Sequence, residues 1–272
     1  MTRSAEPEER PAVSSPPRAA VGEETLRKDR WWLAPLLTVL GITAWLVYAT
    51  ARVFYQGAYF VPEYHYLTPF YSPCVSQGCD AEAALMGRFL PDSPLLPFAA
   101  VSLPFLLLFR FTCYYYRRAY YRSFWLSPPA CAVPDGHRSY KGESRFPLIW
   151  QNSHRYFFYA AFAISLINTV DAVLAMRSPT GFGLGLGNLV LWANVALLWC
   201  YTLGCHSCRH IMGGRLTHFS RNPIRYRLWT MTSKLNARHM FFAWITLLSL
   251  AVTDFYIMAV AAGWFDDPRF IG

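Results

Sequence analysis

The chain has 272 residues, of which 54% are hydrophobic, 17% aromatic and only 15% charged, and its formal net charge is +9. A soluble domain carries about 25% charged residues. The composition therefore excludes an ordinary soluble enzyme and indicates a membrane protein with basic surfaces.

The N-terminal thirty residues are rich in Pro, Ser and charge, and they contain no short apolar core of the signal-peptide type. We expect residues 1–31 to form a disordered cytoplasmic tail. The first apolar segment then stays in the mature protein as a membrane span.

Five apolar segments follow in chain order, and each has the roughly 20 residues that a helix needs to cross a bilayer. Backbone polar groups find no water partner in lipid, so such segments fold as helices. The sequence predicts an all-α, polytopic membrane helical bundle with a short outer tail, 263–272. The expected spans are 32–51, 94–115, 156–176, 186–204 and 240–262.

The distribution of basic residues predicts the orientation. With the N-terminus inside, the cytoplasmic segments 1–31, 110–155 and 205–239 hold 6, 8 and 7 Lys plus Arg, which is 21 of the 25. Cytoplasmic loops carry such an excess in membrane proteins. We therefore expect five spans with the N-terminus inside and the C-terminus outside.

Seven cysteines divide between the two expected sides of the membrane. Cys74 and Cys79 fall in the long outer loop, where an oxidising compartment favours a disulfide over two free thiols. The other five lie on or near the inner side. This pattern, with no transit peptide, favours a bacterial plasma membrane.

The third and fifth expected spans begin alike, with an Asn, a His at the inner boundary and then a Phe-Phe pair. The histidines are His154 and His239, and each span also carries a carboxylate deeper in the membrane, Asp171 or Asp254. A helix N-terminus disfavours imidazolium, so both rings are expected to be neutral, which is the metal-ligating form. The similarity is a weak internal repeat.

The fourth span ends in GCHSCRH at the same face, which adds Cys205, His206, Cys208 and His210. A lone Cys or His at a helix end is more often structural, but the cluster favours a metal centre. Two Cys plus two His suit a tetrahedral zinc or a Rieske-like iron–sulfur centre. His154 and His239 can equally be the axial ligands of a b-type haem.

Three short motifs, NSHRYFFY, GCHSCRH and NARHMFFAW, together with this architecture, resemble the membrane-anchor (cytochrome-b-like) subunit of actinobacterial and mycobacterial succinate dehydrogenase, complex II. The resemblance covers the five spans. It implies flavoprotein and iron–sulfur subunits docked on the cytoplasmic face and electron transfer to menaquinone through a Rieske-like [2Fe-2S] cluster. The implied ligands are His154, Cys205, Cys208 and His239, with His206 and His210 as substitutes.

Quinone needs an apolar slot with a hydrogen-bond donor. Residues near the inner boundary that suit such a slot, or else an ordinary belt of interfacial anchors, are Trp150, Arg155, Tyr156, Trp229 and Arg238. Asp171 and Asp254 lie about 22 Å from that boundary, at 1.5 Å per residue. They suit a proton relay or a second quinone site, or a structural role.

Two other classes stay open from the sequence: a haem-b cytochrome of another quinone oxidoreductase, and a membrane scaffold with a structural zinc. The basic inner loops suit acidic soluble partners or membrane lipid. A further small membrane subunit and homo-oligomerisation stay open as well. The segment 114–125 interleaves aromatics with Arg, but beside a span we interpret it as interfacial, and we expect no nucleic-acid partner.

Overall fold

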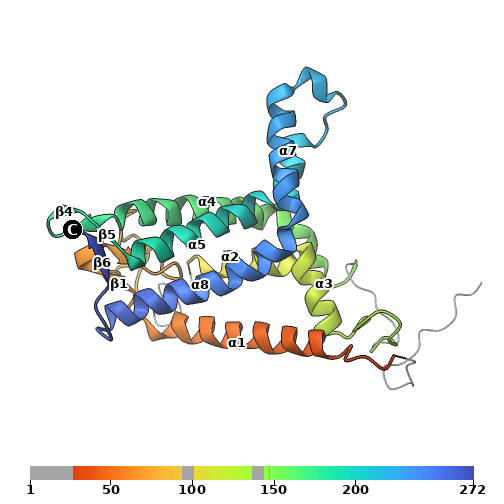
Figure 1. Cartoon of the computed structure of the whole chain (residues 1–272), viewed down its shortest axis with the longest axis horizontal. Helices are drawn as coiled ribbons and strands as arrows, with labels where there is room; N and C mark the ends of the chain where they lie inside the picture. Colours follow the sequence, from red (N-terminus) through yellow and green to blue (C-terminus); the bar gives the residue numbers. More distant parts are fainter. Residues whose placement is uncertain (1–26, 94–100, 137–143, 147) are drawn as a thin grey trace, which may run out of the picture.

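The computed structural model describes residues 27–93, 101–136, 144–146 and 148–272. Its main body is a bundle of roughly parallel and antiparallel helices (Figure 1). The bundle helices are α1 (Leu33–Tyr55), α2 (Leu103–Thr112), α4 (His154–Leu174), α5 (Leu186–Leu203) and α8 (His239–Ala261).

Four of these helices have the length and apolar character of a membrane span within the described residues. They are α1, α4 (with the preceding turn from Ile149), α5 and α8. The chain is thus mostly helical and crosses the membrane several times. Mixed buried and lipid-facing apolar side chains are expected of such helices, because lipid covers what the bundle does not.

The expected second span, 94–115, is described only in part, since residues 94–100 lie outside the described residues. The described part is the shorter apolar helix α2, which ends at Thr112. Pro104 occupies the first turn of α2, where proline is tolerated. A count of five spans and the inside–outside orientation stay predictions, and the predicted tail 1–31 lies almost wholly outside the described residues.

The chain leaves the bundle at one end through one further helix and a helical hairpin. Helix α3 (Tyr114–Ser123) follows α2, and the hairpin joins α6 (His206–Gly213) to α7 (Pro223–Ala237) through the 3-10 turn η5 (Phe219–Arg221). Figure 1 shows α7 running across the direction of the bundle helices. A second 3-10 turn, η4 (Leu148–Ser153), leads into α4.

The opposite end of the bundle is closed by loops and three short antiparallel strand pairs (Figure 1). Cys74 and Cys79 form a disulfide there, in a loop that packs on α1 and α5. The C-terminal segment, expected as an outer tail, folds back as a strand beside the start of α5. The elements are β1 (Phe60–Val61), η1 (Pro62–Tyr64), β2 (Tyr66–Leu67), β3 (Arg177–Ser178), β4 (Gly181–Phe182), β5 (Leu184–Gly185) and β6 (Arg269–Ile271).

Candidate metal centre

Four potential ligands meet at the end of the bundle where α3, α6 and α7 depart. His154 and His239 are the first residues of α4 and α8. Cys113 and Cys205 occupy the breaks between α2 and α3 and between α5 and α6, where both residues have extended backbone. The chain bends out of the bundle at each cysteine, which leaves both thiols facing inward.

His154 and Cys205 form the first of two close Cys–His pairs. His154 Nε2 lies 3.0 Å from Cys205 Sγ, while His154 Nδ1 lies 2.8 Å from the Thr112 hydroxyl. That hydroxyl donates its own hydrogen to the Leu108 carbonyl oxygen at 2.7 Å, so it accepts from His154 Nδ1. Nε2 therefore carries the free lone pair and points toward the thiol, as a metal-ligating imidazole requires.

Cys113 and His239 form the second pair. Cys113 Sγ lies 3.6 Å from His239 Nε2. His239 is only 2% exposed, and its Nδ1 has no hydrogen-bond partner within the described residues. A buried polar nitrogen without a partner is costly and uncommon in native structures, so it marks this ring as part of a site.

Both imidazoles are held flat against aromatic rings. His154 stacks on Phe109 with ring centroids 4.9 Å apart, and His239 stacks on Tyr201 at 4.8 Å. Phe109 and Tyr201 touch each other edge to face at 5.4 Å. The packing fixes the planes of both rings and places them on opposite sides of one aromatic core.

A cavity of about 570 Å³ opens over these pairs and is lined by all four potential ligands. Cys113 and Cys205 are each about 1% exposed, and burial in apolar surroundings disfavours a bare thiolate. A coordinated metal deprotonates a thiol outright, so such a site gains most from a metal.

The donor set fits a metal group that takes two thiolates and two imidazoles. The donors stand as two Cys–His pairs, and no cluster of three or more His, Cys, Asp or Glu in the described residues closes around a single point. A Rieske centre has two thiolates on one iron and two imidazoles on the other, so the Cys–His pairing by itself does not select that group over a single ion.

The structure brings together three of the four predicted ligands, His154, Cys205 and His239, and adds Cys113. Cys208 is buried on α6 but does not line the cavity. His206 and His210 do line it, and the ring of His206 lies 6.2 Å from that of His154. Sequence spacing favoured Cys208 because it neighbours Cys205, whereas Cys113 comes from a different helix break.

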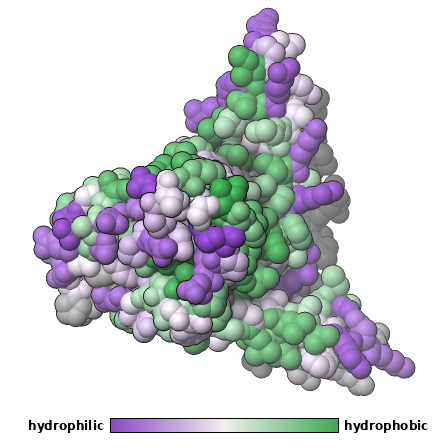
Figure 2. All heavy atoms as spheres, turned by 60° about the vertical axis from the view of Figure 1, so that its left-hand side comes forward, coloured by the Kyte–Doolittle hydropathy of each residue, from purple (hydrophilic) through white to green (hydrophobic). Residues whose placement is uncertain are grey.

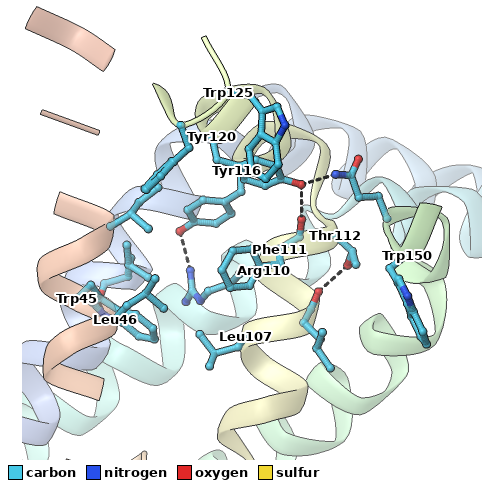
Figure 3. A pocket seen from close by; sticks show the side chains of 15 residues that line it. Trp45, Leu46, Leu107, Arg110, Phe111, Thr112, Tyr116, Tyr120, Trp125 and Trp150 are labelled. Atoms are coloured by element: carbon cyan, nitrogen blue, oxygen red, sulfur yellow. Dashed lines mark hydrogen bonds between the residues drawn. The ribbon is translucent and has the colours of Figure 1, made fainter. Parts of the chain in front are cut away.

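A second, apolar cavity of about 300 Å³ adjoins the first (Figure 3). Thr112 and Gln151 line both cavities. The polar group at the base of the apolar cavity is the Arg110 guanidinium. It donates from Nη1 to the Tyr116 hydroxyl at 2.8 Å and to the Ala243 carbonyl at 3.1 Å. The remaining walls are aliphatic and aromatic side chains of α1, α2, α3 and α8, together with Phe124, Trp125 and Trp150.

The five predicted quinone-site residues separate in the structure. Trp150 lines the apolar cavity (Figure 3), and Arg155 and Tyr156 line the Cys–His cavity. Trp229 lies in the α6–α7 hairpin beneath the Arg209 guanidinium, and Arg238 is exposed between α7 and α8. The sequence offered no signal for Arg110, whose burial follows from contacts between α2 and α8.

Asp171 and Asp254 lie apart, toward the other end of the bundle. Asp254 is fully buried and forms an ion pair with Arg52 of α1, with Nε and Oδ2 2.7 Å apart, and it also accepts from the Tyr48 hydroxyl. Asp171 accepts from the Ser72 hydroxyl and lines a small cavity beside Cys74. The ion pair of Asp254 with Arg52 links α8 to α1, whereas the buried Asp171 borders a small cavity.

A helical bundle with several membrane spans and a Cys–His cluster at one end defines the class of multi-pass membrane subunits. The family profile described as actinobacterial succinate dehydrogenase subunit SdhC matches residues 33–263. This chain therefore belongs to the SdhC family of actinobacterial succinate dehydrogenases.

A solved structure agrees with this assignment. A chain of the Mycobacterium smegmatis Sdh1 complex in the apo form is 63% identical and superposes with a TM-score of 0.88, covering 95% of this chain and 98% of that one. No curated protein matched significantly. The chain is thus a membrane subunit of a succinate dehydrogenase complex and a multi-pass protein of the plasma membrane, as its sequence predicted.

Proposed function

We propose that this subunit passes electrons from the soluble flavoprotein and iron–sulfur subunits to a quinone through a Rieske-like [2Fe-2S] centre held by Cys113, Cys205, His154 and His239. The observation that carries the proposal is the pair of Cys–His contacts, one part-buried and one buried, each formed between a helix start and a helix break around one cavity. Relative to the sequence-based set, Cys113 takes the place of Cys208.

The protein's part in this chemistry is to hold and insulate the donors. Thr112 fixes the tautomer of His154, and the stacking of Phe109 and Tyr201 fixes the planes of both rings. A bound two-iron centre supplies one-electron transfer. The buried surroundings keep water from the sulfurs, and burial and hydrogen bonding of this kind set the potential of such centres.

The apolar cavity beside the centre is our candidate for the quinone ring. A flat apolar ring fits between Trp45, Phe111 and Trp125, and its carbonyl oxygen needs a donor, which Arg110 or Tyr116 supplies (Figure 3). The lining residues Thr112 and Gln151 separate it from the Cys–His cavity, so an electron has a short route between them. Menaquinone is the expected substrate from the resemblance to the mycobacterial type.

The soluble subunits would dock at the end of the bundle that carries the Cys–His cluster. Electrons have to enter there, because the cluster lies at the boundary of the spans and its cavity opens at that end. The N-terminus-inside orientation puts this end on the cytoplasmic side, in keeping with the basic charge of its loops. A further small membrane subunit and a homo-oligomer of the complex are compatible with this arrangement.

The test is metal, acid-labile sulfide and haem analysis of the purified complex, with EPR of the reduced sample, for matched Cys113→Ser and Cys208→Ser variants. Both cysteines are about 1% exposed. We expect Cys113→Ser to lose the low-average-g signal and Cys208→Ser to keep it.

Other outcomes replace parts of the proposal. A signal lost only in Cys208→Ser would restore the sequence-based ligand set. A haem b spectrum lost in His154→Ala would retain the anchor role and exchange the cofactor. If the metal bound by this cluster were zinc, the cluster would have no electron-transfer role and would be a structural metal site.

A further inference from the structure

The α6–α7 hairpin, residues 206–237, projects sideways from the bundle at the level where two spans end (Figure 1). Only Gly204 and Cys205 separate α5 from α6, and only Arg238 separates α7 from α8. Asn236 Nδ2 donates to the Gly204 carbonyl at 2.8 Å. This bond links the two roots of the hairpin, which are the points where it joins α5 and α8. The hairpin, called the arm below, is therefore held at the membrane boundary.

The side chains of α6, η5 and α7 pack against one another, so the arm is an ordered hairpin. Trp229 packs on Phe219, with ring centroids 5.2 Å apart, and under the Arg209 guanidinium at 4.9 Å. A Cβ on Gly213 would lie 2.2 Å from Trp229 Cδ1, so glycine is needed for this close approach. Arg225 donates to the Met212 carbonyl at 2.9 Å and satisfies the end of α6.

One face of α7 is apolar and exposed. Ile224, Leu228 and Met231 recur at helical spacing and are 76%, 36% and 48% exposed. Arg227 and Lys234 lie along the edge of this stripe at the same helical period. Figure 2 shows the arm standing away from the main body with hydrophilic and hydrophobic side chains side by side on its surface.

The charge of the arm is of one sign. The segment 205–239 contains seven Lys or Arg and no Asp or Glu. Two of these, Arg209 and Arg225, make contacts within the arm. The other five are exposed and have no side-chain hydrogen bond or ion pair with any described residue: Arg215, Arg221, Arg227, Lys234 and Arg238.

We propose that the arm is an in-plane anchor that binds anionic phospholipid headgroups of the leaflet at this end of the bundle. A helix lying along the interface inserts an apolar stripe among the acyl chains and extends flanking basic side chains to the headgroups. The arm has both features, and its roots fix it at that depth. The proposal rests on the spans and not on the cofactor assigned above.

The anchor also touches the candidate metal centre. Gly204 directly precedes Cys205, Asn236 lies three residues before His239, and a Cβ on Gly204 would lie 3.2 Å from His239 Nδ1. The arm thus holds the two helix ends that carry these residues.

The experiment uses the whole complex with the photoreactive residue benzoylphenylalanine at Leu228, in nanodiscs that contain phosphatidylglycerol. We expect the mass of the crosslinked product to identify lipid. At Thr230, on another face of α7, we expect little lipid crosslinking. Crosslinks from Leu228 mainly to another protein subunit would overturn the proposal and make the stripe a protein interface.

A second measurement counts the phosphatidylglycerol that the complex retains after washing with zwitterionic detergent. We compare Arg221→Gln/Arg227→Gln/Lys234→Gln with the control Arg30→Gln/Arg118→Gln/Arg145→Gln, which removes as much charge from the same end of the helical bundle. The arm variant should retain at least about tenfold less, since each basic residue near an anionic surface contributes severalfold. Equal retention in both variants would overturn the proposal, and the EPR signal of the metal centre serves as a separate readout of the proposed function.

Discussion

His154 and Cys205 are 51 residues apart in the chain, yet the imidazole Nε2 lies 3.0 Å from the thiol Sγ. The same imidazole is held from behind by Thr112, which comes from a third helix. The contact joins the start of one span to the end of the next, so it forms only when the bundle is assembled.

We expect Thr112→Val to weaken metal binding without unfolding the complex. The hydroxyl fixes the Nδ1 proton of His154, and loss of such an outer partner typically lowers metal affinity about 10- to 100-fold. Iron and sulfide content after mild chelator treatment measures the effect. Thr112→Ser keeps the hydroxyl and should behave as wild type. Equal chelator sensitivity of Val and Ser variants would show that Thr112 does not orient the ring.

We expect Arg110→Lys to raise the KM for quinone about tenfold while leaving the metal content unchanged. Hydrogen bonds from a charged donor contribute about 1.5–3 kcal/mol, and lysine cannot reproduce the planar fork of arginine. Steady-state kinetics with a soluble quinone give KM and kcat separately. Succinate oxidation with an artificial dye acceptor should stay normal. A fall in both activities together would place Arg110 in bundle stability only.

We expect Asp254→Asn to destabilise the subunit by about 3–5 kcal/mol, because it leaves the buried Arg52 without its counter-charge. Thermal unfolding of the detergent-solubilised complex measures this. Asp171→Asn is the matched control, since that buried carboxylate accepts from Ser72 and has no ion pair within the described residues. A larger loss from the Asp171 change would contradict the structural role of the Arg52–Asp254 pair.

We expect the stability of the loop end of the bundle to fall as the pH drops below about 6.5. His65 is buried there, its Nε2 has no partner among the described residues, and burial lowers its pKa from the ordinary 6.5. Below pH 6.5 the His65 ring binds a proton in the unfolded chain but stays neutral in the folded chain. The free energy of unfolding is therefore greatest above the pKa that His65 has in the unfolded chain, and it declines below that pKa.

The measurement for His65 is the Tm of the complex between pH 8 and pH 5, compared with that of His65→Gln. The variant has no titrating ring, so its Tm should fall less steeply through this range. Parallel curves for the two proteins would assign the acid sensitivity to other groups.

Local sequence determined the membrane character, the positions of α1, α4, α5 and α8 and the family. Apolar runs of span length leave the backbone only the helix, and this holds whatever the rest of the chain does. The sequence also placed His154 and His239 at helix starts, because each follows directly on a polar stretch and precedes an apolar one.

Only the tertiary structure brought Cys113 beside His239, and only it paired Arg52 with Asp254. Cys208 neighbours Cys205 in the chain, but α6 turns it away from the cavity, whereas Cys113 is carried in by the packing of α2 against the other spans. Contacts of this kind depend on the relative rotation of packed helices. That rotation is set by many side chains together, and no local pattern in the sequence encodes it.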